Sequence, residues 1–513
     1  MNKFSLPLKP VAVILPLDGV FQWHISLIDW FRRSHTVFVF VAPAKGWDWR
    51  VHFWMGLEHM LFKDAPLARR VPAPNDAQCF DRSLDWSDYR IVLDFARQSM
   101  GLSNGYEVRY DGMADDRYLL GKILRRRSPK ISLNSSSTGL EVAASYPSIQ
   151  DRAVLIRALS TIFSRTAALC TELLDVEPHG RRKPLELSTG AISIQPMYLL
   201  KFAIRLLAEK LANQVIKKVK RTGYWSIALR RSIGVGFPAP PAPTQFSIIS
   251  TPLNSYLADP FIFRYENNSY LFAEEFLYSV NKGVLVCAKI GHDGDVGSFE
   301  VVLERPYHLS YPFIFEHDGQ ILMIPESGAD GKLQLYRCLQ FPGTWEFVAV
   351  LIEEPIADAT LFQEGGVWWI LGTVARFGGS IHDELNAYYS LSLTGPWKPH
   401  SANPIKSDCR SSRCAGKIVR VDGRLFRPAQ NCETGYGEGL VWCEITHLTP
   451  TFFDEVIVES WPAEAGSGFR GLHTYNSDEQ FDAIDLKWDP NICQLKSSLK
   501  SVALKAKTPA KNW

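Results

Sequence analysis

The stretch ADPFIFRYENNSYLFAEE, residues 258–275, carries a pattern that recurs through the C-terminal half of this chain. It begins with a small residue and an acid, runs through an apolar segment, turns at residues 266–269 and returns to two more acids. Two apolar runs joined by a short polar turn predict a β-hairpin. Related stretches follow, SYPFIFEHDGQILMIPES from residue 310, ADATLFQEGGVWWILGT from 357, AGKIVRVDGRLFRPAQN from 415 and, more faintly, GLHTYN from 471.

The position after the small residue is distinctive in each repeat, and its occupants are Asp259, Tyr311, Asp358, Gly416 and His473. These positions are 52, 47, 58 and 57 residues apart. Such a period holds one four-stranded antiparallel blade, so the repeats predict an all-β five-bladed β-propeller over residues 223–490. The strand-like YWSIALR, residues 224–230, is expected to give the last blade its outer strand.

The acids of these repeats predict one chemical site. The first strand of a blade lines the central channel and the second strand returns to the same end, so Asp259 and Glu275 are expected to meet. Glu326 is assigned the equivalent place in the second repeat, and Asp358 begins the third. Paired carboxylates in a cleft suit glycosidic chemistry. The alternative, that each Asp only caps a turn, stays open.

Other residues of the repeats are candidates for binding the substrate. For each of them, core packing or a surface ion pair is the alternative interpretation. The candidates are Tyr311, Arg413, Lys417, Arg427 and His473. No zinc or redox spacing appears among the nine cysteines, so no metal is predicted.

The repeats resemble the five-bladed propellers of the arabinanase, β-xylosidase and invertase superfamily, which includes the family 43-like glycosyl hydrolases. The stretches at 310, 415 and 471 resemble more closely the N-terminal propeller of the glucosamine inositolphosphorylceramide transferase family. The superfamily resemblance implies a general base at Asp259 and an orienting, pKa-tuning role for Asp358. In the superfamily a Glu of the following blade is the general acid, but the fourth repeat of this chain, RSSRCAGKIV, has no Glu at that place, so Glu326 or Glu275 would have to supply the proton. The added positive charge suits a phosphorylated or nucleotide-linked sugar.

The first 178 residues predict an α/β domain. VAVILPL, FQWHISLIDWFRRS and TVFVFVA read as a β-α-β unit of a parallel sheet, YRIVLDFA (89–96) as another strand, and residues 152–175 as a long amphipathic helix. This part resembles a degenerate Rossmann-type formyltransferase domain, of the kind that precedes the propeller in bacterial family members. That chemistry relies on an Asn-x-His motif, yet no histidine lies between His59 and His179. We expect the fold without the formyl-transfer activity.

Residues 179–222 join the two predicted domains, and 196–221 read as a basic amphipathic helix. Residues 196–231 hold nine Lys or Arg and one Glu. Such a helix can lie on an anionic membrane surface, or it can pack between domains with its lysines in solvent. The basic tail, residues 491–513, is expected to be disordered.

The bulk properties exclude some classes of function. A net charge of +2 argues against nucleic acid as a partner, and no run of about 18 uncharged apolar residues spans a membrane. We therefore expect a cytoplasmic protein, peripheral on the inner membrane face if the basic helix binds lipid. Its expected substrate is a carbohydrate or glycolipid, with a nucleotide sugar as co-substrate and other glycan-assembly enzymes as partners.

Three functions remain open from the sequence. The leading hypothesis is a glycosyltransferase of glycan or polysaccharide biosynthesis, with Asp259 as base or nucleophile. The second is a non-catalytic carbohydrate-binding module, and the third is a glycoside hydrolase.

Overall fold

The computed structural model describes residues 9–44, 47–98, 100–175, 202, 204, 225–232, 245–250, 254–462 and 469–488. The chain forms two compact units. The first comprises Met1–Leu211 with Ala375–Asp383, and the second comprises Ala212–Val374 with Glu384–Trp513. Most of the predicted basic helix and the whole predicted tail lie outside the described residues. Within the part of the chain that the structure describes, no helix combines the length and the apolarity needed to cross a bilayer.

The first unit contains a seven-stranded sheet in the order β3-β2-β1-β4-β5-β6-β7. Its strands are β1 (Val11–Pro16), β2 (Val37–Ala42), β3 (Gln78–Cys79), β4 (Ile91–Asp94), β5 (Gly105–Tyr110), β6 (Ile131–Ser135) and β7 (Glu141–Ser145). Its helices are α1 (Gln22–Arg32), α2 (Trp49–Leu61), α3 (Asp116–Leu124) and α4 (Leu155–Asp175), with short 3-10 turns η1 (Pro66–Ala68) and η2 (Trp86–Asp88).

The predicted β-α-β unit is confirmed as β1, α1 and β2, with β1 and β2 parallel. The sheet as a whole is mixed, because β6 pairs antiparallel with β5 and β7 antiparallel with β6. The two faces of β1 belong to different cores: Val11, Val13 and Leu15 share one with residues of α1, α3 and α4, whereas Ala12 and Ile14 belong to another. The formyltransferase-like assignment stays a prediction.

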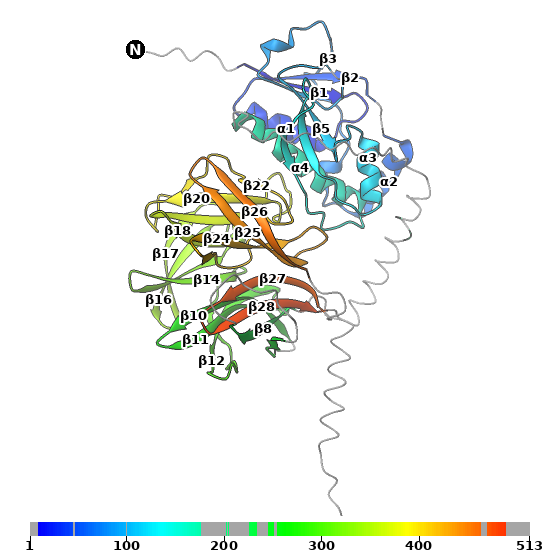
Figure 1. Cartoon of the computed structure of the whole chain (residues 1–513). Helices are drawn as coiled ribbons and strands as arrows, with labels where there is room; N and C mark the ends of the chain where they lie inside the picture. Colours follow the sequence, from blue (N-terminus) through cyan, green and yellow to red (C-terminus); the bar gives the residue numbers. More distant parts are fainter. Residues whose placement is uncertain are drawn as a thin grey trace, which may run out of the picture. The chain divides into compact units, whose positions relative to one another are not determined.

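The second unit is a five-bladed propeller (Figure 1). Blade 1 has β10 (Ser255–Tyr265), β11 (Asn268–Leu277), β12 (Lys282–Ile290) and β13 (Glu300–Leu303); blade 2 has β14 (Ser310–His317), β15 (Gln320–Glu326), β16 (Leu333–Gln340) and β17 (Thr344–Ile352), with η4 (Gly328–Asp330) before β16. Blade 3 has β18 (Ala357–Glu364), β19 (Val367–Thr373), β20 (Glu384–Ser390) and β21 (Lys398–Pro399), and β22 (Lys406–Ser407) also pairs with β20. Blade 4 has β23 (Val419–Val421), β24 (Arg424–Asn431), β25 (Gly439–Leu448) and β26 (Phe453–Pro462).

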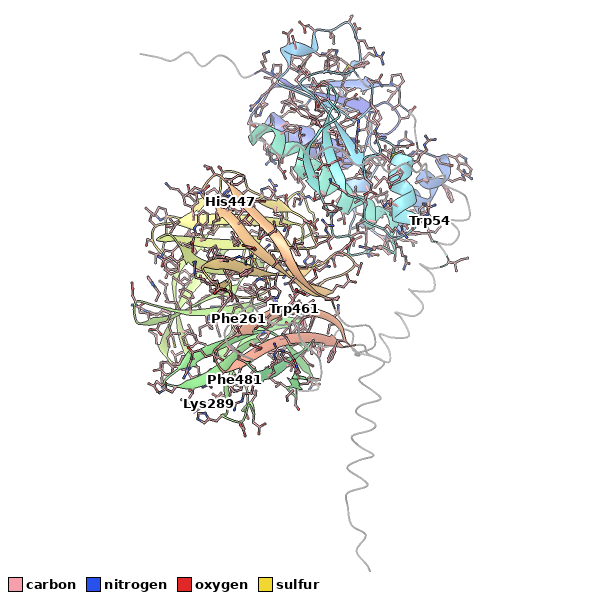
Figure 2. All side chains as sticks on the ribbon, in the orientation of Figure 1. Trp54, Phe261, Lys289, His447, Trp461 and Phe481 are labelled. Carbon is pink, nitrogen blue, oxygen red and sulfur yellow. The ribbon has the colours of Figure 1, made fainter. Side chains whose placement is uncertain are left out.

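Blade 5 closes the ring with strands from both ends of the propeller. It combines β27 (Phe469–Ser477) and β28 (Phe481–Trp488) with β8 (Trp225–Arg231) and β9 (Ser247–Ile248), in that order. The predicted closing strand is thus third in its blade, and β9 is outermost. A buried ion pair fastens this closure, because Arg230 Nε on β8 lies 2.8 Å from Asp482 Oδ2 on β28. Figure 2 labels three buried aromatic residues of this unit, Phe261 on β10, Trp461 on β26 and Phe481 on β28.

The distinctive repeat positions lie at irregular points of the inner strands. Asp259, Tyr311 and Asp358 have positive φ angles of 50°, 44° and 49°, and each sits where the register of its strand shifts. A bulky residue such as Tyr311 rarely adopts this conformation, which stores strain. The fourth position requires glycine: Gly416 has φ 140°, and a Cβ there would lie 1.9 Å from the Tyr475 carbonyl oxygen. The repeats therefore encode a recurring backbone distortion, at one residue in or just before the inner strand of a blade.

Candidate functional site

Three of the distorted positions, Asp259, Tyr311 and Asp358, turn a backbone N–H toward a carboxylate of a neighbouring blade. The Asp259 N–H donates to Asp485 Oδ2 over 3.0 Å, and the Tyr311 N–H donates to Asp259 Oδ2 over 3.2 Å. In the same way, the Asp358 N–H donates to Glu326 Oε2 over 3.0 Å. Buried N–H groups need partners, so these carboxylates join the blades as well as supplying charge.

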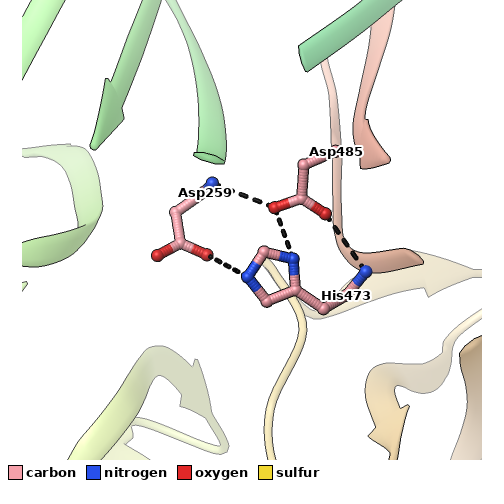
Figure 3. Close-up of side chains that lie close together, drawn as sticks. All are labelled: Asp259, His473 and Asp485. Atoms are coloured by element: carbon pink, nitrogen blue, oxygen red, sulfur yellow. Dashed lines mark hydrogen bonds and ion pairs between the residues drawn. The ribbon is translucent and has the colours of Figure 1, made fainter. Parts of the chain in front are cut away.

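A chain of side chains, Asp485–His473–Asp259, links blade 5 to blade 1 (Figure 3). Asp485 Oδ2 lies 2.6 Å from His473 Nδ1, and Asp485 Oδ1 accepts the backbone N–H groups of His473 and Thr474. His473 Nε2 lies 3.4 Å from Asp259 Oδ1, which also accepts the Thr474 hydroxyl over 2.9 Å. The second carboxylate thus fixes the imidazole that faces the first.

The surroundings of these three side chains shift the pKa values of His473 and Asp259 toward neutral pH. The His473 ring stacks on Trp225 at 4.0 Å and meets the edge of Tyr436 at 5.0 Å. Burial alone would lower the pKa of His473, but Asp485 and Asp259 raise it above its usual value. Burial raises the pKa of Asp259 to about 6, although His473 opposes this. Asp259 therefore changes charge within reach of physiological pH.

A second cluster joins blades 2, 3 and 4 around Asp358. Arg413 Nε donates to Asp358 Oδ2 over 2.5 Å, and Gln430 Nε2 donates to the same oxygen over 2.7 Å. Arg413 also lies 3.6 Å from Glu326 Oε2 and stacks over Tyr436 at 4.9 Å. Burial and the charge of Asp358 raise the pKa of Glu326 to about 8, against the effect of Arg413. Glu326 is thus mainly protonated at neutral pH.

Glu274 brings a further buried carboxylate to this region. It pairs with Ala258, the residue before Asp259, just as Glu326 pairs with Ser310, the residue before Tyr311. Its Oε1 has no hydrogen-bond partner among the described residues and lies 3.6 Å from a nitrogen of His308. Burial, followed by the charges of Asp259 and Glu326, raises the pKa of Glu274 well above its usual value. We call Asp259, Glu274, Glu326, Asp358 and Asp485, with His473 and Arg413, the acidic cluster.

Glu275 was expected in that place, and the strand register corrects this. Glu275 pairs with Leu257, and its Oε1 accepts the Ser255 hydroxyl over 2.6 Å. It lines a separate cavity of about 440 Å³ with residues of β9 and of the loop 294–299. Adjacent strand residues point to opposite faces, so Glu274 and Glu275 cannot both join the cluster.

The propeller matches a known protein family. Residues 239–489 match the family model described as "Glucosamine inositolphosphorylceramide transferase 1, N-terminal". The propeller belongs to this family. Proteins named glucosamine inositolphosphorylceramide transferase 1 are 33% identical to this chain over 234 residues in Oryza sativa subsp. japonica and over 239 residues in Arabidopsis thaliana. These matches cover 44% and 45% of this chain but 32% and 31% of the relatives, so the chain spans about a third of their length.

Solved structures give weaker likenesses. An α-L-arabinofuranosidase from Podospora anserina matches with a TM-score of 0.36 and 9% identity, over 52% of this chain and 98% of that one. A GH43 protein from Bacillus licheniformis matches with a TM-score of 0.32 and 16% identity, over 42% of this chain and 47% of that one.

Two of the predicted binding residues, Tyr311 and Lys417, make contacts between blades inside the propeller. The Tyr311 hydroxyl lies 2.8 Å from Thr360 Oγ1 and accepts the Gly416 N–H over 2.7 Å, so it ties blade 2 to blades 3 and 4. Lys417 Nζ reaches the Ile262 carbonyl on blade 1 at 3.4 Å. Burial lowers the pKa of Lys417 to about 8. Both side chains are occupied with contacts between blades.

Arg427 is fully buried in blade 4. Its guanidinium makes two hydrogen bonds to Glu455, of 3.0 and 2.6 Å, and donates to the carbonyls of Ser411 and Ser412. Those carbonyls lie just before Arg413 in the chain. Arg427 therefore supports the segment that carries Arg413, whereas Arg413 and His473 lie in the acidic cluster itself.

Among the described residues, one group offers metal-ligand atoms close together: Asp259, His473 and Asp485 have such atoms within 4.8 Å of one another. Asp485 already accepts N–H groups at both oxygens, including two backbone N–H groups at Oδ1. A cation would have to replace several of these bonds. The donor set therefore suits proton sharing better than metal binding.

Sequence reasoning missed Glu274, Asp485, Gln430 and Tyr436. One signal for Glu274 was available, because aligning the two 18-residue repeats at 258 and 310 places Glu326 opposite Glu274. For Asp485 the signal was an acid inside the otherwise apolar FDAIDLKW. Tyr436 lies on the loop between β24 and β25, outside any repeat.

We predict that Glu326→Gln stabilises the chain increasingly as the pH rises from about 5 to 8. The wild-type carboxyl has a folded pKa of about 8 against an ordinary 4.5, so its stabilising proton is present at low pH and lost as pH rises through 8. The amide has no proton to lose. Melting temperatures of both proteins across this pH range measure the effect, and a constant difference would contradict the raised pKa.

Proposed function

We propose that the acidic cluster handles the sugar part of a glycolipid and forms or remodels a glycosidic bond there, by glycosyl transfer from a nucleotide sugar. The observation that carries this proposal is the buried Asp485–His473–Asp259 chain beside carboxyls that hold protons. Titratable groups whose pKa values are pushed apart are typical of acid–base sites. A base at Asp259 and an acid at Glu326 would both be in their working form between pH 6 and 8.

In the proposed step, the hydroxyl oxygen of the acceptor bonds to the anomeric carbon of the donor, and its proton passes to Asp259. The bond from that carbon to the nucleotide phosphate breaks, and its electron pair leaves with the phosphate. Glu326 or Glu274 would give a proton to the leaving oxygen. His473, held by Asp485, would stabilise the charge on Asp259 before the transfer.

Family membership supports a glycolipid as the substrate class. The relatives are named for transfer to inositolphosphorylceramide, an anionic sphingolipid. The chain spans about a third of their length, so we assign their activity to it only as part of this proposal.

One observation favours a second function, carbohydrate binding without catalysis. Arg413 and Gln430 already hold Asp358, the residue to which the resemblance assigns an orienting role. An acid engaged in this way serves binding or structure as readily as catalysis.

The test is mass spectrometry of products made by the purified full chain with a panel of nucleotide sugars and extracted membrane lipids. We expect a glycosylated lipid whose rate of formation falls below pH 6, as Asp259 takes up a proton, and above pH 8, as Glu326 loses one. Glycan binding without any product would support the binding function instead. A product whose rate is flat from about pH 5 to 9 would place the chemistry outside the acidic cluster.

A further inference from the structure

Three aromatic side chains of blade 1 lie beside the acidic cluster without joining a hydrophobic core. Tyr256 on β10 faces Phe276 on β11, with ring centroids 5.0 Å apart and an interplanar angle of 6°. Tyr278, just after β11, meets both rings edge-on at 5.9 and 6.1 Å. All three are half-buried, and none of them packs into a hydrophobic cluster formed by the described residues. We call Tyr256, Phe276 and Tyr278 the aromatic shelf.

The strand register places the shelf in line with Glu274. Tyr256 pairs with Phe276, and two residues further on Ala258 pairs with Glu274. Side chains two residues apart on a strand point to the same face, so the shelf continues the face from which Glu274 enters the acidic cluster. Burial raises the pKa of Tyr256, and Glu274 and Asp259 raise it further, which places the phenol close to both acids.

Two groups that can form hydrogen bonds lie at the inner end of the shelf. Glu274 is 5% exposed, and its Oε1 has no hydrogen-bond partner among the described residues. His308, whose ring lies 6.0 Å from that of Phe276, accepts the Gly283 N–H at Nδ1 over 2.9 Å. Burial lowers the pKa of His308, so the ring is neutral and its Nε2 carries the proton. A buried carboxyl oxygen without a partner in the chain calls for one from a ligand or from water.

These surroundings favour an uncharged sugar ring over other ligands. One face of such a ring presents C–H groups that pack flat on an aromatic side chain, while its hydroxyls donate and accept hydrogen bonds. An aliphatic chain would leave Glu274 and His308 without partners. An anionic sugar is disfavoured, because the acids beside Tyr256 would repel it. A nucleotide is disfavoured for the same reason, since its phosphates would lie close to those acids.

We propose that the aromatic shelf, with Glu274 and His308, binds an uncharged sugar ring of the acceptor and holds its hydroxyl next to Asp259. This inference rests on the proposed function, because it gives the acceptor sugar its place at the acidic cluster. Tyr256 and Phe276 supply the stacking surface, and hydrogen bonds to Glu274 and His308 fix the rotation of the ring in its plane. Loss of the shelf should therefore weaken sugar binding at equilibrium, whether or not a donor is present.

The experiment is a titration of the full chain with methyl glucoside, methyl galactoside and methyl mannoside, followed by saturation-transfer NMR. The variant carries Tyr256→Leu and Phe276→Leu, which remove both rings and keep apolar side chains on the paired strands. We expect at least one glycoside to bind the wild type, with transfer strongest to the hydrogens of one ring face. The variant should bind that glycoside about tenfold more weakly. The uronic acid glycoside of the same sugar should bind the wild type more weakly than its uncharged counterpart.

The matched control carries Phe347→Leu and Tyr389→Leu, an exposed phenylalanine of β17 and a half-buried tyrosine of β20, and should bind like the wild type. Melting temperatures show whether each variant folds, and Tyr256→Leu alone is titrated if the double change prevents folding. Equal binding by the wild type and the shelf variant would overturn the proposal, as would a wild type that binds none of the glycosides. Uridine diphosphate that binds in their place, and only when the shelf is intact, would overturn it in favour of a nucleotide.

Glycoside binding and sugar transfer are measured separately, so each can fail alone. Binding that needs the shelf, in a chain that makes no glycosylated lipid, would support the shelf and contradict the proposed transfer. Transfer at the wild-type rate by the shelf variant would contradict the shelf and leave the proposed function standing.

Discussion

Asp259→Asn is expected to lower the rate of glycosyl transfer on the order of 10³-fold, the typical contribution of a positioned acid–base group. The amide cannot take the proton of an acceptor hydroxyl, and it removes the charge that His473 faces at 3.4 Å. Initial rates of product formation at neutral pH, with saturating donor and lipid acceptor, measure the loss. Because the chemical step is affected, kcat should fall far more than KM changes.

The control for this prediction is Glu316→Gln, which removes an exposed carboxylate from β14 of the same propeller. It should transfer sugar like the wild type. The amide introduced by Asp259→Asn must also keep the bonds from Tyr311 and Thr474, so the melting temperature of the variant has to be measured beside its rate. A folded Asp259→Asn protein that works within a few-fold of the wild type would remove this residue from the chemistry.

Glu455→Ala is expected to lower the free energy of unfolding of the propeller by about 3–5 kcal/mol. Burial alone would raise the pKa of Glu455, but Arg427 and Lys406 lower it to about 2, so the group is ionised at neutral pH. The side chains of Arg427 and Glu455 are 0% and 2% exposed. Removing the acid leaves buried cations without their partner. Urea unfolding followed by tryptophan fluorescence measures the change.

Two further variants separate this cause from general damage. Replacing both partners, Arg427→Met with Glu455→Leu, should restore most of the lost stability, because no fully buried charge is then left unpaired. Lys406, which also loses Glu455, is 18% exposed and keeps access to solvent. Removing the acid of a surface pair, Glu444→Ala beside the largely exposed Arg424, should leave the urea midpoint nearly unchanged. A double variant as unstable as the sum of its single changes would contradict the ion-pair explanation.

The repeated pattern was sufficient to predict the propeller, its five blades and the closing role of the segment before the first repeat. Local chemistry explains this success. Alternating apolar residues and polar turns define each hairpin, and a 47–58-residue period leaves room for one blade. The same pattern marked Asp259, Asp358, Gly416 and Tyr311 as distinctive, and three of these four are non-glycine residues in the left-handed region.

The identity of the second carboxylate depended on the tertiary register. Three residue steps, from Ala258 to Phe261, oppose two steps, from Glu274 to Phe272. The sequence prediction chose Glu275 because the end of the hairpin returns beside Asp259. The bulge breaks the simple alternation along the strand, and the structure places Glu274 there instead. Aligning the two 18-residue repeats does pair Glu274 with Glu326. Which side chains of the hairpin face the acidic cluster, however, follows from the bulge.

The strands, the order of the blades and the distinctive position of each repeat follow from the local pattern of the sequence. Which side chains share the acidic cluster depends on the tertiary structure. Asp485 meets Asp259 across 226 residues, and Arg413 meets Asp358 across 55, because closing the ring brings the inner strands together. Burial within that ring then raises the pKa values of Asp259 and Glu326, an effect that no local pattern contains.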